Sequence, residues 1–256
     1  MMRCVYGPVA SWRLGRSLGI DPISQPHKVC SFDCVYCQIG PTKVLTTERT
    51  IFIPTDKVIT ELKAVLARVT PDVITFSGMG EPTLASNLNE LIDKIRELTS
   101  LPLAILTNSS LITDPQVYRA LLKLDIVVFK LDAPNEPMFQ QINRPAPGIT
   151  LNEIITAIHS FRKEFKKKLA LQMMFIDANK PVAHDMAAIA SKLEPDEVQL
   201  NTPLRPSPVK PLSPADITAI EYQFRALPYI SVYKRHAPEV SPINKLDVFL
   251  RRKVVE

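Results

Sequence analysis

The sequence is poor in several residue types that define other classes of protein. Its 256 residues include only four cysteines, seven glycines and one tryptophan. A small secreted domain would be far richer in cysteine and would begin with a secretory signal, which the start of this chain does not resemble. No apolar run is long enough to cross a bilayer, so we expect a cytoplasmic protein without a membrane span.

What the chain does contain is an ordinary globular composition with a mild excess of basic residues. Hydrophobic residues make up 46% of the chain, which suffices for a sizeable core, and the formal net charge is +5. That charge permits an acidic partner such as RNA but is too small to require one. The few glycines are expected where the backbone turns sharply or comes close to a ligand.

Apolar runs and helical patterns alternate along most of the chain. Buried strands are predicted at VITFSG, LPLAILT, DIVVFKLDA, LALQMMFI and EVQLN, and helical patterns follow them, in the case of DIVVFKLDA after a proline-rich loop. Capping residues at Thr150 and Ser213 mark two of the helix starts. With the cysteine-bearing stretch counted as a strand, six βα units predict parallel strands that close or partly close into a barrel with helices outside.

Three of the four cysteines are crowded into one stretch, at Cys30, Cys34 and Cys37. Such crowding indicates metal ligands, because thiolates bind soft metals and iron–sulfur clusters. Three thiolates on a [4Fe-4S] cluster would leave one iron free for a substrate or cofactor. Two alternatives stay open: an electron carrier, for which only Cys4 could supply a fourth thiolate, and a zinc-stabilised nucleic-acid-binding protein that also uses His27.

Glycines and polar residues follow the predicted strands, and ligands of parallel barrels bind at the carboxyl ends of strands. These residues are Gly78, Gly80, Glu81, Asn108, Lys130, Asp132, Gln172 and Asn201. Glu81 is suited to accept from a protonated amine, and Asn108 to contact a ribose or carboxylate. Lys130 and Asp132 share one face of a strand, where they need each other or a charged ligand.

Arg13 and Arg16, near the start of the chain, are further candidates. A guanidinium group there could bind a carboxylate or a phosphate, although solvated arginines are the commoner outcome.

The motif CSFDCVYC (residues 30–37) resembles the cluster motif of the radical S-adenosylmethionine superfamily, in which an aromatic residue, here Tyr36, precedes the last cysteine. The flanking stretches YGPVASWRLGRSLGID and CVYCQIGPT resemble the branch that contains the tRNA wyosine synthetases and related iron–sulfur oxidoreductases. SGMGEP resembles the GGE motif, which binds the amino group of the cofactor's methionine. Met79 stands where a second glycine is common, and Lys130 where many relatives have serine.

The resemblance implies an open, partial (β/α)6 barrel of parallel strands whose first strand lies in residues 1–22. We expect a single domain, with residues 1–22 as an N-terminal extension and residues 229–256 as a C-terminal extension. The implied ligands of a [4Fe-4S] cluster are Cys30, Cys34 and Cys37. The expected contacts to S-adenosylmethionine are Tyr36, Gly78, Gly80, Glu81, Asn108, Lys130, Asp132 and Asn201.

The same resemblance implies the chemistry. An electron from a donor such as flavodoxin or ferredoxin would cleave S-adenosylmethionine to a 5'-deoxyadenosyl radical, which abstracts hydrogen from an unidentified substrate. Modification of tRNA is the alternative, with FRKEFKKK, Lys234–His236 and Arg251–Lys253 as the basic stretches that could contact phosphates. The wyosine-type archaeal members carry a second cysteine cluster, which Cys4 alone cannot replace. The sequence names no catalytic residue.

Overall fold

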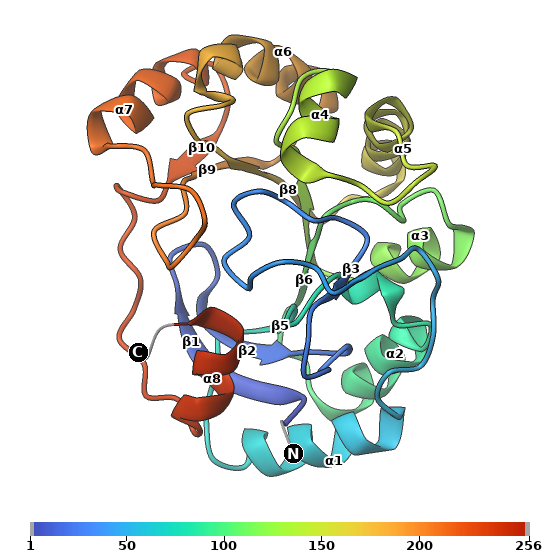
Figure 1. Ribbon diagram of the computed structural model, residues 1–256. Coiled ribbons are helices and arrows are strands. Elements are labelled where there is room, and N and C mark those ends of the chain that lie inside the picture. The colour runs from blue at the N-terminus through green and yellow to red at the C-terminus, as the bar shows by residue number, and fades with distance from the viewer. Residues whose placement is uncertain (1–2, 254–256) are drawn as a thin grey trace.

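The computed structural model describes residues 3–253, whose main sheet has eight strands in the order β1-β2-β5-β6-β7-β8-β9-β10. The strands are β1 (Val5–Ser11), β2 (Gly15–Ile20), β5 (Val73–Phe76), β6 (Leu103–Thr107), β7 (Ile126–Lys130), β8 (Lys168–Met174), β9 (Glu197–Asn201) and β10 (Tyr229–Ser231). Neighbours pair in parallel except β1 and β2, which form an antiparallel hairpin. The sheet curls into an incomplete ring, seen in Figure 1, which confirms the predicted partial barrel.

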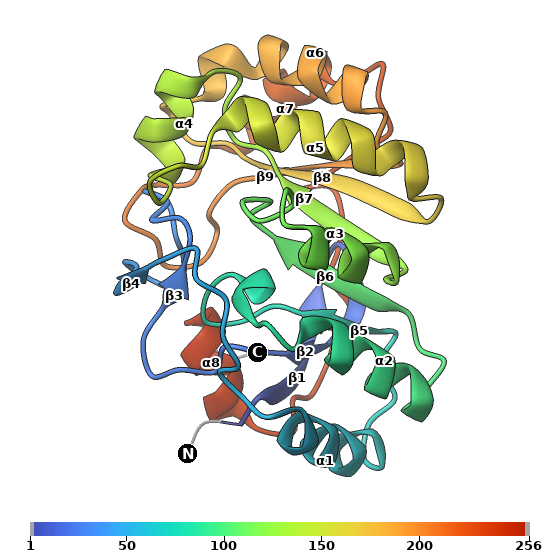
Figure 2. The same cartoon turned by 90° about the vertical axis from the view of Figure 1, so that its right-hand side faces the viewer.

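Helices cover the outer face of the curled sheet (Figure 2). They are α1 (Thr55–Leu66), α2 (Leu88–Leu98), α3 (Pro115–Leu122), α5 (Leu151–Glu164), α6 (Ala183–Leu193) and α7 (Pro214–Gln223), with short 3₁₀ turns η1 (Pro82–Leu84) and η2 (Lys180–Val182). Each of these helices buries one apolar side against the sheet. The predicted caps are confirmed, since the hydroxyls of Thr150 and Ser213 accept from the amides of Glu153 and Asp216.

Two expectations about the region around the cysteines were wrong. β3 (Val29–Cys30) pairs with β4 (Val44–Leu45) in a separate two-stranded sheet, so the cysteine-bearing strand is not a barrel strand and β2 takes its place. The sequence predicts a proline-rich loop where α4 (Glu136–Asn143) forms. The Asn135 side chain caps the start of this helix, because it accepts a hydrogen bond from the Met138 amide. Pro137 lies in the first turn, where a backbone N–H has no acceptor within the helix, so the N–H that proline lacks is not missed.

The two ends of the described chain meet at β1 (Figure 1). Helix α8 (Lys245–Arg252) packs against β1, so this part of the predicted C-terminal extension is a docked helix. Arg251 Nε donates to Asp21 Oδ2 at 2.8 Å, and both side chains are fully buried. Strand β10 pairs with β9, so the predicted C-terminal extension begins inside the barrel sheet.

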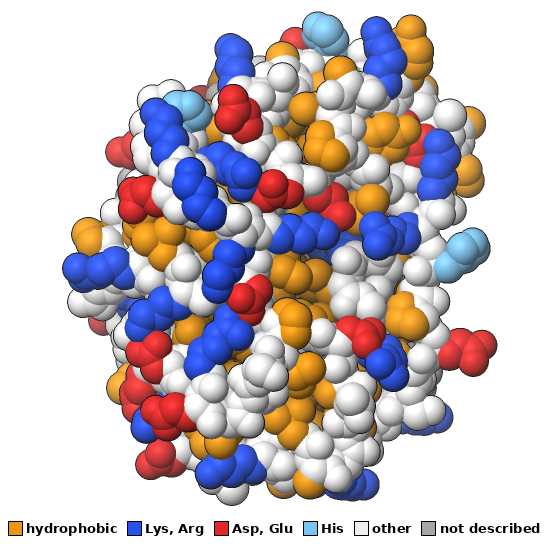
Figure 3. Space-filling model, turned by 180° about the vertical axis from the view of Figure 1, so that it is seen from behind, with side chains coloured by type: hydrophobic (Ala, Val, Ile, Leu, Met, Phe, Trp, Pro, Cys, Tyr) orange, Lys and Arg blue, Asp and Glu red, His pale blue; other side chains and the backbone are white. Residues whose placement is uncertain are grey.

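The surface offers two further facts. Within residues 3–253, no helix combines the length and the apolar character that a membrane span requires. On the face opposite to that of Figure 1, basic and acidic side chains are mixed (Figure 3). The net positive charge is therefore not gathered into one patch on that face.

Candidate functional site

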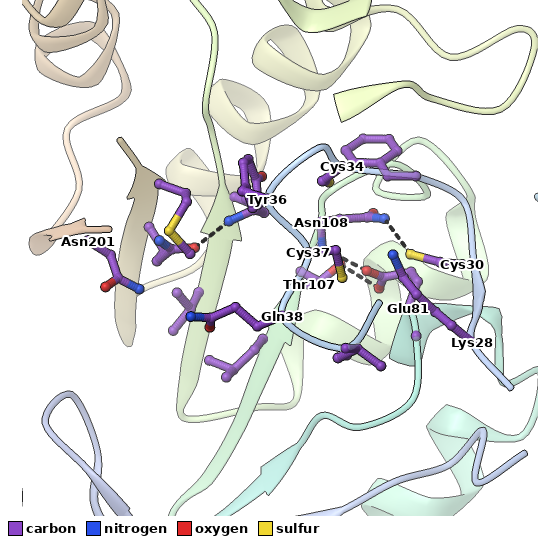
Figure 4. A pocket seen from close by; sticks show the side chains of 18 of the residues that line it. Lys28, Cys30, Cys34, Tyr36, Cys37, Gln38, Glu81, Thr107, Asn108 and Asn201 are labelled. Atoms are coloured by element: carbon purple, nitrogen blue, oxygen red, sulfur yellow. Dashed lines mark hydrogen bonds between the residues drawn. The ribbon is translucent and has the colours of Figure 1, made fainter. Parts of the chain in front are cut away.

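An open cavity lies at the carboxyl ends of the barrel strands, beside the loop that carries the three cysteines (Figure 4). The predicted site residues that line it are Cys30, Cys34, Tyr36, Cys37, Gly80, Glu81, Asn108, Lys130 and Asn201. Arg13 and Gln172 line it too, as do Lys28, Gln38 and Arg205, which sequence reasoning missed. Gly78, Asp132 and Arg16 are not among the residues that line it.

Helix α4 holds the cysteine loop in place. The Phe32 ring packs edge-on against Phe139, with centroids 5.3 Å apart. The amide of Asp33 donates to the Asn143 carbonyl at 3.1 Å, and the Asp33 carboxylate accepts from the Thr42 amide at 2.7 Å. The loop is therefore fixed by the protein's own contacts, and a bound metal group would meet a preformed set of thiols.

The thiols lie in a setting that suits a metal group. Burial raises the pKa of Cys30 to about 12 and also raises the pKa of Cys34, so neither thiol ionises by itself at neutral pH, whereas a coordinated metal deprotonates a thiol outright. Two amides already point at sulfur: Asn108 Nδ2 donates to Cys30 Sγ at 3.6 Å, and Asn143 Nδ2 to Cys34 Sγ at 3.5 Å. Hydrogen bonds to sulfur tune iron–sulfur clusters, so these residues fit such a group.

The geometry disfavours the zinc alternative. His27 is exposed and is not among the residues that line the cavity. Within residues 3–253, no three His, Cys, Asp or Glu side chains converge as the ligands of a single ion. A closed zinc site needs four ligands on one ion, whereas a cluster takes one thiolate on each of several irons. All three cysteines line the cavity and His27 does not, so a zinc site that uses His27 is disfavoured.

Lys28 adds a positive charge beside the sulfurs. Its side chain is only 5% exposed. Burial disfavours its charged form, but the nearby Cys37, Cys30 and Cys34 outweigh burial and raise the pKa of Lys28. A signal for this residue was present in the sequence, because side chains two apart in an extended segment share one face and Lys28 precedes Cys30 by two.

The glycine loop after β5 is joined directly to the cysteine strand. The Val29 amide donates to the Met79 carbonyl at 3.1 Å, and the Glu81 amide donates to the Val29 carbonyl at 3.2 Å. Gly80 lies between these bonds with a φ of +152°, and a Cβ there would lie 1.6 Å from the Val29 carbonyl oxygen. Only glycine allows this approach, which places the two predicted motifs against each other.

Glu81 is buried and well hydrogen-bonded. Its Oε1 accepts from the Thr83 amide at 3.1 Å and from the hydroxyls of Thr83 and Thr107, both at 2.7 Å. Its Oε2 accepts from the Asn108 amide at 2.7 Å. Burial raises the pKa of Glu81 and these donors lower it. Oε2 therefore has one protein donor and keeps capacity to accept from a ligand amine.

Two residues predicted to contact the cofactor support the site from outside the cavity lining. Gly78 packs on Asp21, since a Cβ on Gly78 would lie 2.1 Å from Asp21 Cγ. Asp132 is 2% exposed and accepts from the Tyr36 hydroxyl and, at 2.8 Å, from the Met174 amide. Burial and then the Asp132 charge raise the pKa of Tyr36 well above its ordinary value. Asp132 thus positions Tyr36 and the cysteine loop.

Lys130 lies in the cavity lining next to this network. Its Nζ donates to Gln172 Oε1 at 2.6 Å, is 3.5 Å from Asp132 Oδ1 and is 4.9 Å from the centroid of the Tyr36 ring. The expectation that Lys130 and Asp132 need each other is met. Gln172 Nε2 is buried and has no hydrogen-bond partner within residues 3–253, so the cavity retains a donor for a ligand.

Comparison with known proteins agrees with this geometry. Residues 24–181 match the family model described as the Radical SAM superfamily. A UPF0026 protein of Synechocystis sp. is 46% identical over 207 residues, which cover 80% of this chain and 77% of that protein.

Two solved structures share the fold. Streptococcus suis SuiB bound to S-adenosylmethionine matches with a TM-score of 0.63 at 15% identity, over 80% of this chain and 48% of that chain. Archaeal TYW1 matches with a TM-score of 0.54 at 16% identity, over 83% of this chain and 72% of that chain. This chain thus covers about half of SuiB, and at these identities the likeness shows the fold alone.

Proposed function

Because the chain belongs to the radical SAM superfamily, we propose that it is an enzyme that reductively cleaves S-adenosylmethionine and abstracts hydrogen from a substrate held in the cavity. The observation that carries this proposal is the direct contact between the cysteine strand and the glycine loop at one cavity. Cys30, Cys34 and Cys37 would hold the [4Fe-4S] cluster. The residues that would contact S-adenosylmethionine are Tyr36, Gly80, Glu81, Asn108, Lys130 and Asn201.

When bound, these cofactors supply one-electron chemistry that ends in hydrogen abstraction by a 5'-deoxyadenosyl radical. The chain's own part is positioning and exclusion of water. Asp132 and Asn143 fix Tyr36 by hydrogen bonds, and Leu106 and Val128 contribute apolar side chains to the cavity wall. An apolar wall keeps water away from reactive species.

A tRNA substrate has less support. Three of the five basic side chains in the stretch FRKEFKKK pair with acidic residues, among them Arg162 with Asp196 at 2.8 Å and Lys167 with Asp125 at 2.9 Å. Lys168 is likewise 2.9 Å from a carboxylate oxygen of a glutamate on β9. Lysines and arginines that contact RNA phosphates need their charge available, so this stretch is better explained as a solvated, ion-paired face.

The test of the proposed function is anaerobic reconstitution with iron and sulfide, reduction with dithionite, and assay for 5'-deoxyadenosine in the presence of S-adenosylmethionine. We expect nucleoside formation that requires the reconstituted cluster. A colourless protein with stoichiometric zinc would contradict the proposal and favour a nucleic-acid-binding protein. A reduced cluster that never cleaves S-adenosylmethionine would instead favour an electron carrier.

Glu81→Gln should weaken the binding of S-adenosylmethionine roughly tenfold or more, because hydrogen bonds to a charged group contribute about 1.5–3 kcal/mol. Cluster content should persist, since Glu81 is not proposed as a ligand. The measurement is calorimetric titration of the reconstituted protein with S-adenosylmethionine. Glu61→Gln is the matched control, because Glu61 also accepts from backbone amides, those of Cys4 and Val5, but is not part of the cavity lining. Equal affinities in the two variants would exclude a cofactor contact by Glu81.

A further inference from the structure

The cavity reaches toward the gap between the two edges of the curled sheet. One edge is the β1–β2 hairpin and the other is β10, which lies next to β9. Arg13, in the turn of the hairpin, crosses this gap, since its Nη1 donates to Gln199 Oε1 on β9 at 3.5 Å. Figure 4 shows Gln38 and Asn201 at one end of the cavity and Lys28 and Cys30 at the other, so the β9 end is distinct from the thiol end.

Guanidinium groups gather at this β9 end. Arg205 donates through Nε and Nη2 to Gln38 Oε1 at 3.1 and 2.8 Å, which orients its planar fork. Its Nη1 donates to the Arg252 carbonyl at 3.2 Å. Burial, followed by the charges of Arg205 and Arg252, lowers the pKa of Arg13 to about 10. Arg13 still carries its charge at neutral pH, so three cations repel one another here.

The charge of Arg13 is not balanced by a carboxylate. Within residues 3–253, no carboxylate lies within ion-pair distance of Arg13, and its buried Nε has no hydrogen-bond partner. The charge of Glu197 raises the pKa of Arg13, but Glu197 is already paired with Lys168 at 2.9 Å. Arg13 is partly buried, and a buried guanidinium nitrogen with an unused donor is costly unless an acceptor such as an anion binds there.

Arg16, the other arginine of the hairpin, shows the contrasting case. It is exposed, and its Nε and Nη2 donate to Asp72 Oδ1 at 3.1 and 2.7 Å. Such a pair on the surface needs no further partner. Of the two arginines singled out in the sequence, only Arg13 therefore points to a ligand.

We propose that Arg13, Arg205 and Gln38 form the site for a phosphate group of the substrate, at the end of the cavity away from Cys30. This inference rests on the proposed function and names its substrate class, a small phosphomonoester. A phosphomonoester brings nearly two negative charges to the two guanidinium groups of the site, those of Arg13 and Arg205, whereas a carboxylate or an RNA phosphodiester brings one. The Nε of Arg13 is the unused donor of the site, and hydrogen bonds from guanidinium groups to phosphate oxygens are strong because both partners are charged. Because Arg13 lies inside the cavity, the anion must be a terminal group able to enter it.

The test is calorimetric titration of the reconstituted protein with phenyl phosphate and, as its carboxylate counterpart, phenylacetate. We expect saturable binding of phenyl phosphate, with phenylacetate at least roughly tenfold weaker. Arg13→Gln should weaken phenyl phosphate binding roughly tenfold or more, and Arg205→Gln provides a second variant should the first fail to fold. Arg16→Gln, on the same hairpin, should bind like the unaltered protein. Equal binding by all variants, or equal affinity for phenylacetate, would overturn the proposal.

Two further measurements distinguish the proposed phosphate site from the cofactor site and test it independently of the proposed activity. Phenyl phosphate binding should persist when S-adenosylmethionine is saturating; displacement would mean that the arginines hold the cofactor's carboxylate, which overturns the phosphate site. Assay of 5'-deoxyadenosine on the same preparation tests the activity separately. Nucleoside formation without phenyl phosphate binding overturns the phosphate site alone, while binding without nucleoside formation supports the site and overturns the proposed activity.

Discussion

Replacement of Cys34 by serine should abolish the intact [4Fe-4S] cluster while the barrel stays folded. Serine is close in shape to cysteine, but its hydroxyl is a far poorer ligand for iron than a thiolate. Loss of a group that only supports a metal ligand already costs about 10–100-fold in affinity or activity, so loss of a ligand should cost more than about 100-fold. The measurements are iron and sulfide content after reconstitution and the cluster's visible absorbance. Far-ultraviolet circular dichroism should match that of the unaltered protein.

Cys4→Ser is the matched control for this experiment. Cys4 is fully buried outside the cysteine loop, and its thiol donates to Glu61 Oε2 at 3.0 Å, a bond that a serine hydroxyl can also make. This variant should assemble the cluster with unchanged iron content. Full cluster content in the Cys34→Ser protein would remove Cys34 from the ligand set, and loss of the cluster in the Cys4→Ser protein would identify Cys4 as a ligand.

The parts of the fold that the sequence predicted are those set by local periodicity. Strands such as VITF and helices such as α2 are readable because their apolar spacing repeats within a few residues. Helix α4 has no such independent signal. This helix is stabilised by packing of Phe139 on Phe32. Phe32 belongs to the cysteine loop, which is more than a hundred residues away in the chain. Tertiary contacts of this kind cannot be read from a short window.

The candidate site, too, contains residues that the sequence predicted and residues that it did not. The cysteines and Gly80 were predicted because metal ligation and close backbone approach restrict residue type. Asp132 was expected to meet a ligand, but it lies beyond the end of β7, where alternation no longer fixes side-chain direction, and it turns toward Tyr36. Arg205 was missed because its role depends on Gln38, which is 167 residues distant in the chain.

Gly80→Ala should weaken both the fold and the binding of S-adenosylmethionine. The added Cβ would lie 1.6 Å from the Val29 carbonyl oxygen, and this neighbour is backbone that cannot rotate away. Overpacking costs about 1–3 kcal/mol and a positive φ in a non-glycine residue about 1–2 kcal/mol more. We expect a loss in the free energy of unfolding on the order of 3 kcal/mol, measured by urea denaturation of the metal-free protein.

Gly148→Ala distinguishes the effect of backbone strain from that of the steric clash. Gly148 also has a positive φ, +87°, but a Cβ there would meet nothing within 4 Å. It should lose only the 1–2 kcal/mol or so of backbone strain and keep its affinity for S-adenosylmethionine. The excess loss in Gly80→Ala then measures how tightly the Val29 backbone is joined to the glycine loop. If the two variants lose the same stability and bind the cofactor equally well, the contact between the two motifs is not what builds the site.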